Sequence, residues 1–138
     1  MIAVDASLVF KLLVQEDLSD QVDALWKRWL ANGLTIYAPF LLHYEIYNAI
    51  RRTAWKKKLH PKDQERILDV YHGLDITFIA DTENLSLALS MSTTHNLPAI
   101  YDAVYLAMAQ AMHLEFWTAD LKLFNAVSAK LNFVRKVS

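Results

Sequence analysis

The sequence predicts an α/β protein whose central sheet is mostly parallel. Short runs of β-branched and aromatic residues recur along the chain, and longer stretches with helical periodicity separate them. Strands that alternate with helices in this way form βαβ units, in which helices cover both faces of a parallel sheet. The predicted strands are residues 2–4, 35–37, 76–79, 115–118 and 133–137.

The composition predicts one folded domain over residues 1–138. Apolar residues make up 54% of the chain and charged residues 21%, which is the opposite of a disordered composition. The absence of cysteine excludes a disulfide scaffold, a thiolate nucleophile and a cysteine-ligated metal. No apolar run approaches the roughly 20 residues that span a bilayer, and no basic segment precedes an apolar one at the N-terminus. We therefore expect a cytoplasmic protein without membrane contact.

Helices with clear periodicity are expected at residues 19–31, 40–57, 62–71 and 102–112. Gly33 and Gly73 follow the first and the third of these, at the position where a left-handed residue ends a helix. The helix over 102–112 is apolar nearly all the way round, which is typical of a buried central helix. The helix over 40–57 is amphipathic, and its inward stripe is Leu42, Ile46, Ala49, Ile50 and Thr53.

Glu45, Asn48 and Arg52 lie along one flank of that stripe, at spacings of three and four residues. Glu45 is notable because an uncompensated carboxylate beside an apolar stripe is expensive to desolvate. It needs a partner, which is either Arg52 on the same flank or a group that other acids of the chain also bind.

Three aspartates share a placement at the ends of predicted elements. Asp5 ends the first strand, Asp120 closely follows the fourth, and Asp102 opens the buried helix. Ligands of open α/β sheets bind beyond the carboxyl ends of the strands, so Asp5 and Asp120 face one crevice if their strands are neighbours. Each has a hydroxyl nearby, from Ser7 and Thr118 respectively. The alternative is that each aspartate only caps the helix that follows it.

Carboxylates gathered around one crevice repel one another, and a hard divalent cation resolves that conflict. Mg²⁺ is typically held by one or two carboxylates together with water and substrate phosphates. It polarises a phosphoryl oxygen and activates water for hydrolysis of a phosphodiester. The acids therefore indicate a metal-dependent phosphodiesterase, with the hydroxyls as hydrogen-bonding supports.

The formal net charge is −1, yet seven of the 14 basic residues fall within residues 51–66. Such a patch is compatible with phosphate binding and equally with an ordinary solvated helix end. The candidates for a nucleic-acid-binding rim are Arg52, Lys56, Lys57 and Lys58.

Other chemistries find less support. The five histidines include no pair at i,i+4, no glycine-rich phosphate-binding motif is present, and Ser7 has no evident base. Trp26 and Trp29 are expected in the core or at a subunit interface.

Four short segments resemble, in order, the motifs of PIN domains. They are Val4-Asp5-Ala-Ser7, residues 44–52 around Glu45, residues 101–109 with Asp102, and Trp117-Thr-Ala-Asp120. The chain is most similar to the VapC-type toxins of type II toxin–antitoxin systems, and the resemblance covers essentially its whole length. One departure is Asn96-Leu-Pro98, which stands where many relatives have a glycine-containing turn.

The resemblance implies a three-layer α/β/α fold and a Mg²⁺- or Mn²⁺-dependent endoribonuclease that hydrolyses RNA. It also implies a homodimer and a small antitoxin protein that blocks the site. Its metal site would consist of Asp5, Glu45, Asp102 and Asp120, with Ser7, Thr118 and Asn48 at supporting positions.

Two other functions remain open from the sequence. A catalytically silent PIN-like module would bind RNA or a protein, although it has no reason to keep so costly a set of acids. A receiver-like phosphoacceptor domain also collects aspartates beyond strand ends, but the paired acids after the first strand and the lysine after the last are not evident here.

Overall fold

A computed structural model describes residues 1–138 and contains a five-stranded sheet surrounded by helices. The strand order is β3-β2-β1-β4-β5, and every neighbouring pair is parallel. The predicted fold class is confirmed, and the sheet is parallel throughout. In chain order the elements are β1 (Ile2–Val4), α1 (Ala6–Leu13), α2 (Ser19–Ala31), β2 (Ile36–Pro39), α3 (Leu41–Lys57), α4 (Pro61–His72), β3 (Thr77–Ile79), the 3₁₀ turn η1 (Thr82–Asn84), α5 (Leu85–Thr94), α6 (Tyr101–Ala111), β4 (Glu115–Thr118), α7 (Leu121–Val127) and β5 (Val134–Lys136).

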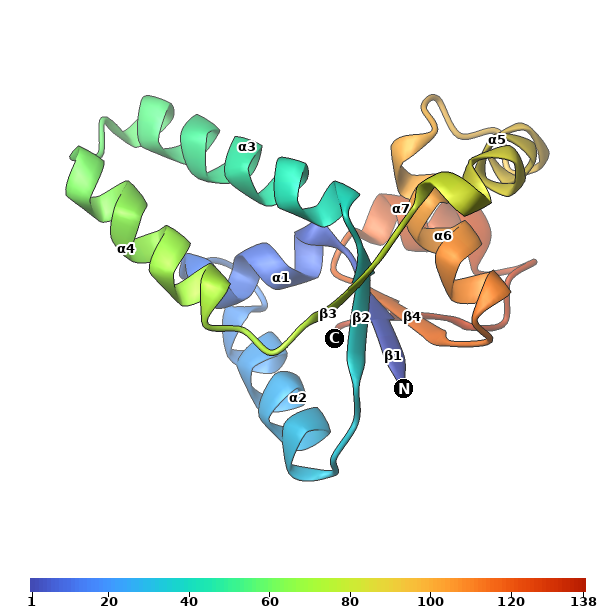
Figure 1. Cartoon of the computed structure of the whole chain (residues 1–138), viewed down its shortest axis with the longest axis horizontal. Coiled ribbons are helices and arrows are strands. Elements are labelled where there is room, and N and C mark those ends of the chain that lie inside the picture. The colour runs from blue at the N-terminus through green and yellow to red at the C-terminus, as the bar shows by residue number, and fades with distance from the viewer.

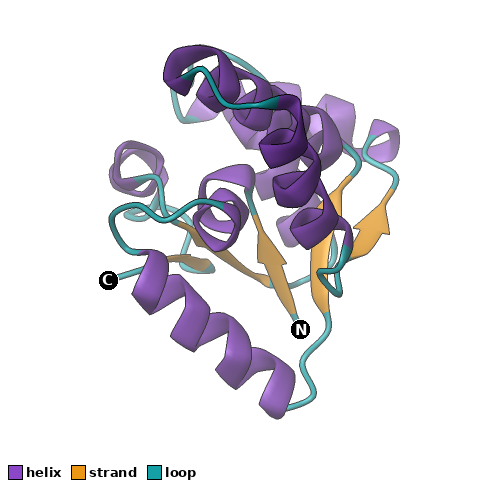
Figure 2. Cartoon of the chain, turned by 90° about the vertical axis from the view of Figure 1, so that its left-hand side faces the viewer, coloured by secondary structure: helices purple, strands orange, loops and turns teal.

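The chain builds the sheet outward from β1 in two directions. It runs from β1 through β2 to β3, then crosses back to β4 and continues to β5. Because crossovers between parallel strands are right-handed, connections that run in opposite directions place their helices on opposite faces. Accordingly α1 to α4 lie on one side of the sheet and α5 to α7 on the other (Figures 1 and 2). The direction reverses between β1 and β4, which makes their carboxyl ends the expected ligand-binding edge.

The core is centred on α6, as its apolar sequence predicts. All seven residues from Ala103 to Ala109 are buried, and α6 packs against β1, β2, β4 and α5. On the other side of the sheet, Trp29 of α2 lies between Trp26 and Trp117, with ring centroids 6.1 and 5.5 Å away. Trp26 and Trp29 are both buried, so their assignment to the core is confirmed.

The helices α3 and α4 form an arm that projects from the sheet (Figure 1). Lys58 ends α3 in a left-handed conformation, and Pro61 opens α4 at a position where its missing N–H costs nothing. The four buried residues of α3 are Leu42, Ile46, Ile50 and Ala54, whereas Ala49 and Thr53 of the predicted stripe are only half-buried. That half-exposed edge of α3 faces a surface groove described below.

The two glycines differ in conformation. Gly33 has a φ of +69° after α2, as predicted. Gly73 was expected to be left-handed as well, and that expectation is wrong, since its φ is −82°. Its N–H bonds back to the carbonyls of Asp69 and Val70, so the last turn of α4 closes in a right-handed conformation. No helix of the chain combines the length and the apolar character that crossing a membrane requires.

The packing of the tryptophans predicts their contributions to stability. Replacement Trp29→Ala should lower the free energy of unfolding by about 3–5 kcal/mol, because it removes a buried ring that contacts two others. Trp55→Ala should change it by less than about 0.5 kcal/mol, because the Trp55 side chain is 75% exposed. Urea denaturation of the two variants and the wild type measures both effects. Equal losses would contradict this division between core and surface.

Candidate active site

Asp5 and Asp120 lie at the carboxyl ends of two neighbouring strands. The strands β1 and β4 pair in parallel, with Val4 opposite Trp117, and each aspartate follows its strand by one or two residues. The sequence predicts that the two acids face one crevice if their strands are neighbours, and the strands are neighbours. The strand ends that carry the two acids are therefore adjacent at the reversal point of the sheet, and their shared crevice stays a prediction.

Asp5 is held by three hydrogen bonds. The Ser7 hydroxyl donates to its Oδ1 at 2.7 Å and the Thr118 hydroxyl to its Oδ2 at 2.5 Å. The backbone N–H of Leu8 donates to Oδ1 at 3.1 Å. Ser7 in turn accepts from the N–H of Ala119 at 3.1 Å, so the two hydroxyls link the end of β1 to the end of β4.

Two of the three aspartates cap helices as well. Asp5 caps α1 through Leu8, and Asp120 caps α7 by accepting from the N–H of Leu123 at 3.1 Å. Asp102 caps nothing, because it lies in the first turn of α6 and the N-cap there makes no side-chain hydrogen bond. Helix capping thus accounts for the position of one carboxylate oxygen of Asp5 and one of Asp120. It does not account for the position of Asp102.

The partner of Glu45 is Tyr105. The Tyr105 hydroxyl donates to Oε1 of Glu45 at 2.5 Å, whereas Arg52 makes no ion pair with it. Tyr105 is 1% exposed, and a buried tyrosine hydroxyl usually requires a hydrogen-bonding partner. Tyr105 is not among the predicted site residues, because its neighbours in the buried helix are apolar and the pattern there is that of a core position. A tyrosine hydroxyl inside an otherwise apolar, buried segment is the one sequence feature that indicates a hydrogen-bonding role there.

Electrostatic repulsion links the four acids, because each of them either raises the pKa of another or has its own pKa raised by another. Burial raises the pKa of Asp5 to about 6, and the charge of Asp102 adds to that increase against the three hydrogen bonds. Burial and then the charge of Asp102 also raise the pKa of Glu45, against the hydrogen bond from Tyr105. The pKa of Asp102 is raised by burial and by Asp120. Asp102 is therefore the acid through which the other three interact.

No basic side chain neutralises this set. The three ion pairs of the structure involve Glu16, Asp63 and Glu115, and none includes one of the four acids. As placed, no three of the acidic and imidazole groups are close enough to hold an ion together. The donor chemistry nevertheless fits a hard divalent cation, because the groups are carboxylate oxygens whose mutual repulsion lacks a countercharge.

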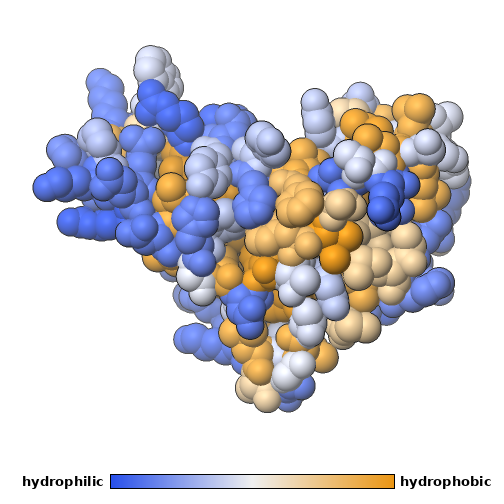
Figure 3. Space-filling view, viewed as in Figure 1, coloured by the Kyte–Doolittle hydropathy of each residue, from blue (hydrophilic) through white to orange (hydrophobic).

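Glu45 and Asp120 line a cavity of about 400 Å³, whereas Asp5 and Asp102 do not line it. Its polar lining combines both charge signs, and the side chains that matter for chemistry are Ser7, Lys11, Glu45, Asn48, Arg52 and Asp120. In the space-filling view, a notch separates the α3–α4 arm from the helices on the other side of the sheet (Figure 3). The predicted supporting residue Asn48 lines the same cavity as Glu45 and Asp120.

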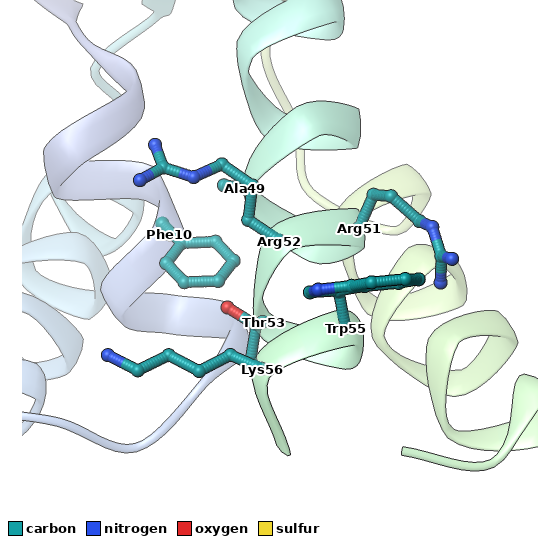
Figure 4. A pocket seen from close by; sticks show the side chains of 7 residues that line it. All are labelled: Phe10, Ala49, Arg51, Arg52, Thr53, Trp55 and Lys56. Atoms are coloured by element: carbon teal, nitrogen blue, oxygen red, sulfur yellow. The ribbon is translucent and has the colours of Figure 1, made fainter. Parts of the chain in front are cut away.

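A second cavity of about 810 Å³ adjoins the first along α3, and we call it the α3 groove (Figure 4). The two cavities share Phe10, Ala49 and Arg52. Of the predicted basic rim, Arg52 and Lys56 line the α3 groove, whereas Lys57 and Lys58 line neither cavity.

The chain is similar to known proteins in both sequence and fold. No protein-family model matches the chain. Ribonuclease VapC9 of Mycobacterium tuberculosis is 29% identical over 130 residues, which cover 94% of each chain. Among solved structures, one from Pyrobaculum aerophilum superposes with a TM-score of 0.73 at 22% identity, over 99% of this chain and 83% of the other. A toxin–antitoxin complex from Klebsiella pneumoniae superposes with a TM-score of 0.70 at 16% identity, over 100% and 98%.

The raised pKa of Asp5 predicts a pH dependence of stability in the metal-free protein. A carboxyl whose folded pKa lies above its unfolded value contributes stability that is present at low pH and is lost as pH rises through the folded pKa. The free energy of unfolding in chelator should therefore fall by about 2 kcal/mol as pH rises from about 4 to about 6, and by about 3 kcal/mol in total once pH is well above the folded pKa. Asp5→Asn should lack this part of the decline in denaturant titrations across the same range. Identical pH profiles for the two proteins would contradict the assignment.

Proposed function

Because this chain belongs to the PIN-domain family, together with the VapC-type ribonucleases, we propose that it is a metal-dependent endoribonuclease that acts as a toxin. The observation that carries the proposal is the set of four carboxylates at the ends of β1 and β4 and on α3 and α6. Asp102 contributes to the raised pKa of Asp5 and of Glu45, Asp120 contributes to that of Asp102, and no ion pair of the structure includes any of the four.

Asp5, Glu45, Asp102 and Asp120 would hold Mg²⁺ or Mn²⁺. A divalent cation bound there supplies Lewis-acid polarisation of the scissile phosphate and activation of water. Its positive charge would favour the ionised carboxylates of Asp5, Glu45 and Asp102, whose pKa values burial and a neighbouring carboxylate raise, so binding and ionisation would favour each other.

The neighbouring side chains hold the acids in position. Ser7 and Thr118 use their hydroxyl protons on Asp5, which keeps both of its oxygens oriented at the strand ends. Tyr105 does the same for Glu45. Ligand-supporting hydrogen bonds of this kind usually affect metal affinity or activity by about 10- to 100-fold.

Polar and basic groups of the adjoining cavity face the substrate. Arg52 provides positive charge for the RNA backbone, and the Asn48 amide provides both a donor and an acceptor. The ammonium of Lys11 is already paired with Glu16 at 3.0 Å. An RNA strand in this cavity would lie beside Glu45 and Asp120 and within the part of the surface that Arg52 and Asn48 also line.

We also propose that an antitoxin protein blocks this site and that the chain forms a homodimer. The similarity to a toxin–antitoxin complex supports the antitoxin. A catalytically silent module is disfavoured, because four mutually repelling acids cost stability and bring no benefit to a protein that only binds RNA.

The first test is the metal dependence of RNA cleavage. The purified protein should cleave RNA with Mg²⁺ or Mn²⁺ and lose that activity in excess chelator. Asp102→Asn should reduce the rate more than 100-fold, and Thr118→Val by about 10- to 100-fold, because Asp5 then loses one of its donors. Asp17→Asn, at an exposed acid outside the site, serves as the matched control. Undiminished cleavage in chelator would refute the metal mechanism.

The second test separates a shared metal site from independent helix caps. At neutral pH, Asp102→Asn should leave the metal-free protein as stable as the wild type or more so, because the pKa of Asp102 is raised and its charge is therefore destabilising there. Mg²⁺ should stabilise the wild type by mass action, by about 2.7 kcal/mol at 100 times the dissociation constant, and the variant much less. Thermal melts of both proteins with and without millimolar Mg²⁺ measure the difference. A full shift in the variant would exclude Asp102 from the site.

A further inference from the structure

The α3 groove has a lining that suits a nucleic-acid strand. Three of its side chains are cationic, namely Arg51, Arg52 and Lys56, and none is acidic. Trp55 stands among them with 75% of its surface exposed. The other tryptophans are buried or half-buried, so Trp55 is the one large indole that the fold leaves available to a ligand.

The indole of Trp55 is already oriented by a cation. The Arg51 guanidinium carbon lies 5.5 Å from the ring centroid, in a cation–π arrangement. In Figure 4 the Arg51 side chain lies along one side of the ring, and Phe10 of α1 reaches in between Arg52 and Lys56. Exposed aromatic rings flanked by basic groups are the elements from which single-strand binding grooves are built.

The groove is continuous with the acidic cavity. Arg52, Ala49 and Phe10 line both, and the connecting wall is the single helix α3. Trp55 follows Glu45 by ten residues, which is about 15 Å along a helix that rises 1.5 Å per residue. Roughly four stacked nucleotides, at ~3.4 Å each, cover that distance.

We propose that the α3 groove binds a single-stranded segment of the RNA substrate, with one base stacked on Trp55 and the neighbouring phosphates held by Arg51, Arg52 and Lys56. This proposal rests on the proposed ribonuclease function and adds to it a subsite at a defined distance from the acids.

The binding test uses the full-length protein in chelator and a fluorescein-labelled 12-nucleotide single-stranded RNA. Trp55→Ala should weaken binding by about 5- to 150-fold, which is the range for loss of one base–aromatic stack. Trp55→Phe should retain most of the affinity. Tyr44→Ala is the matched control, because Tyr44 is equally exposed on the same helix but lines neither cavity, and it should bind like the wild type.

The salt dependence of binding tests the phosphate contacts. Lys56→Gln should lower the log–log salt slope by about 0.7, the value for one phosphate contact with a single strand. Lys57→Gln should lower it by less than half as much, because Lys57 is adjacent in sequence but does not line the groove.

The cleavage test uses distance as its criterion. With Mg²⁺ present, Trp55→Ala should raise KM for long RNAs with little change in kcat, because the stack is made equally in the ground and transition states. RNAs are then shortened to fewer than about four nucleotides, first on one side of the cut and then on the other. When the shortened side is the one that points to the groove, the RNA no longer reaches Trp55, and the variant and the wild type should cleave it equally.

The outcomes distinguish the subsite from the proposed function. If the wild type cleaves RNA and Trp55→Ala binds and cleaves it unchanged, the function stands and the subsite is overturned. If the wild type neither binds nor cleaves RNA, the proposed function fails and the subsite fails with it.

Discussion

The parallel pairing of β1 with β4 is the constraint on which the candidate site depends. These two strands meet where the chain reverses its direction across the sheet, so their carboxyl ends open into the same crevice. Asp5 is buried at that junction and is held by hydroxyls from both strand ends. A shift of one strand against the other would separate Thr118 from Asp5 and leave a buried carboxylate short of a donor, which is a costly state. The pairing and the hydrogen bonds therefore stabilise the same register.

The central helix α6 connects the core to the site. Its apolar surface packs against three strands and α5, and this fixes where its N-terminal turn and its Tyr105 hydroxyl lie. Asp102 enters the field of the other acids from that turn, and Tyr105 reaches Glu45 on α3. Core packing thus holds together charges that repel one another, and the free energy needed comes from apolar burial elsewhere in the helix. A cation in the site would relieve that opposition.

The long helix α3 gives the site its extent. Its N-terminal half carries Glu45 beside the acids, and its C-terminal half carries Trp55 and the basic residues of the α3 groove. Because one continuous helix joins the two regions, their separation is fixed. A substrate strand that spans both would be held at a constant distance from the acids, and positioning of this kind contributes to catalysis through reduced loss of entropy.

The sequence by itself determined the alternation of strands and helices, the burial of α6 and the candidate acids. The predicted strands 2–4 and 115–118 coincide with β1 and β4, because short β-branched runs and helical periodicity are local properties of the chain. The placement of the four acids, the basic rim and Asn48 as one functional set stays a prediction of sequence motifs. Tertiary structure alone decided that Tyr105, and not Arg52, partners Glu45, that β1 and β4 are neighbours, and that Lys56 but not Lys57 lines the groove. The hydrogen bonds that hold the site join residues 60 and 113 positions apart, and both those distances and the desolvation that raises the pKa of Asp5 depend on how whole elements pack, which no local pattern records.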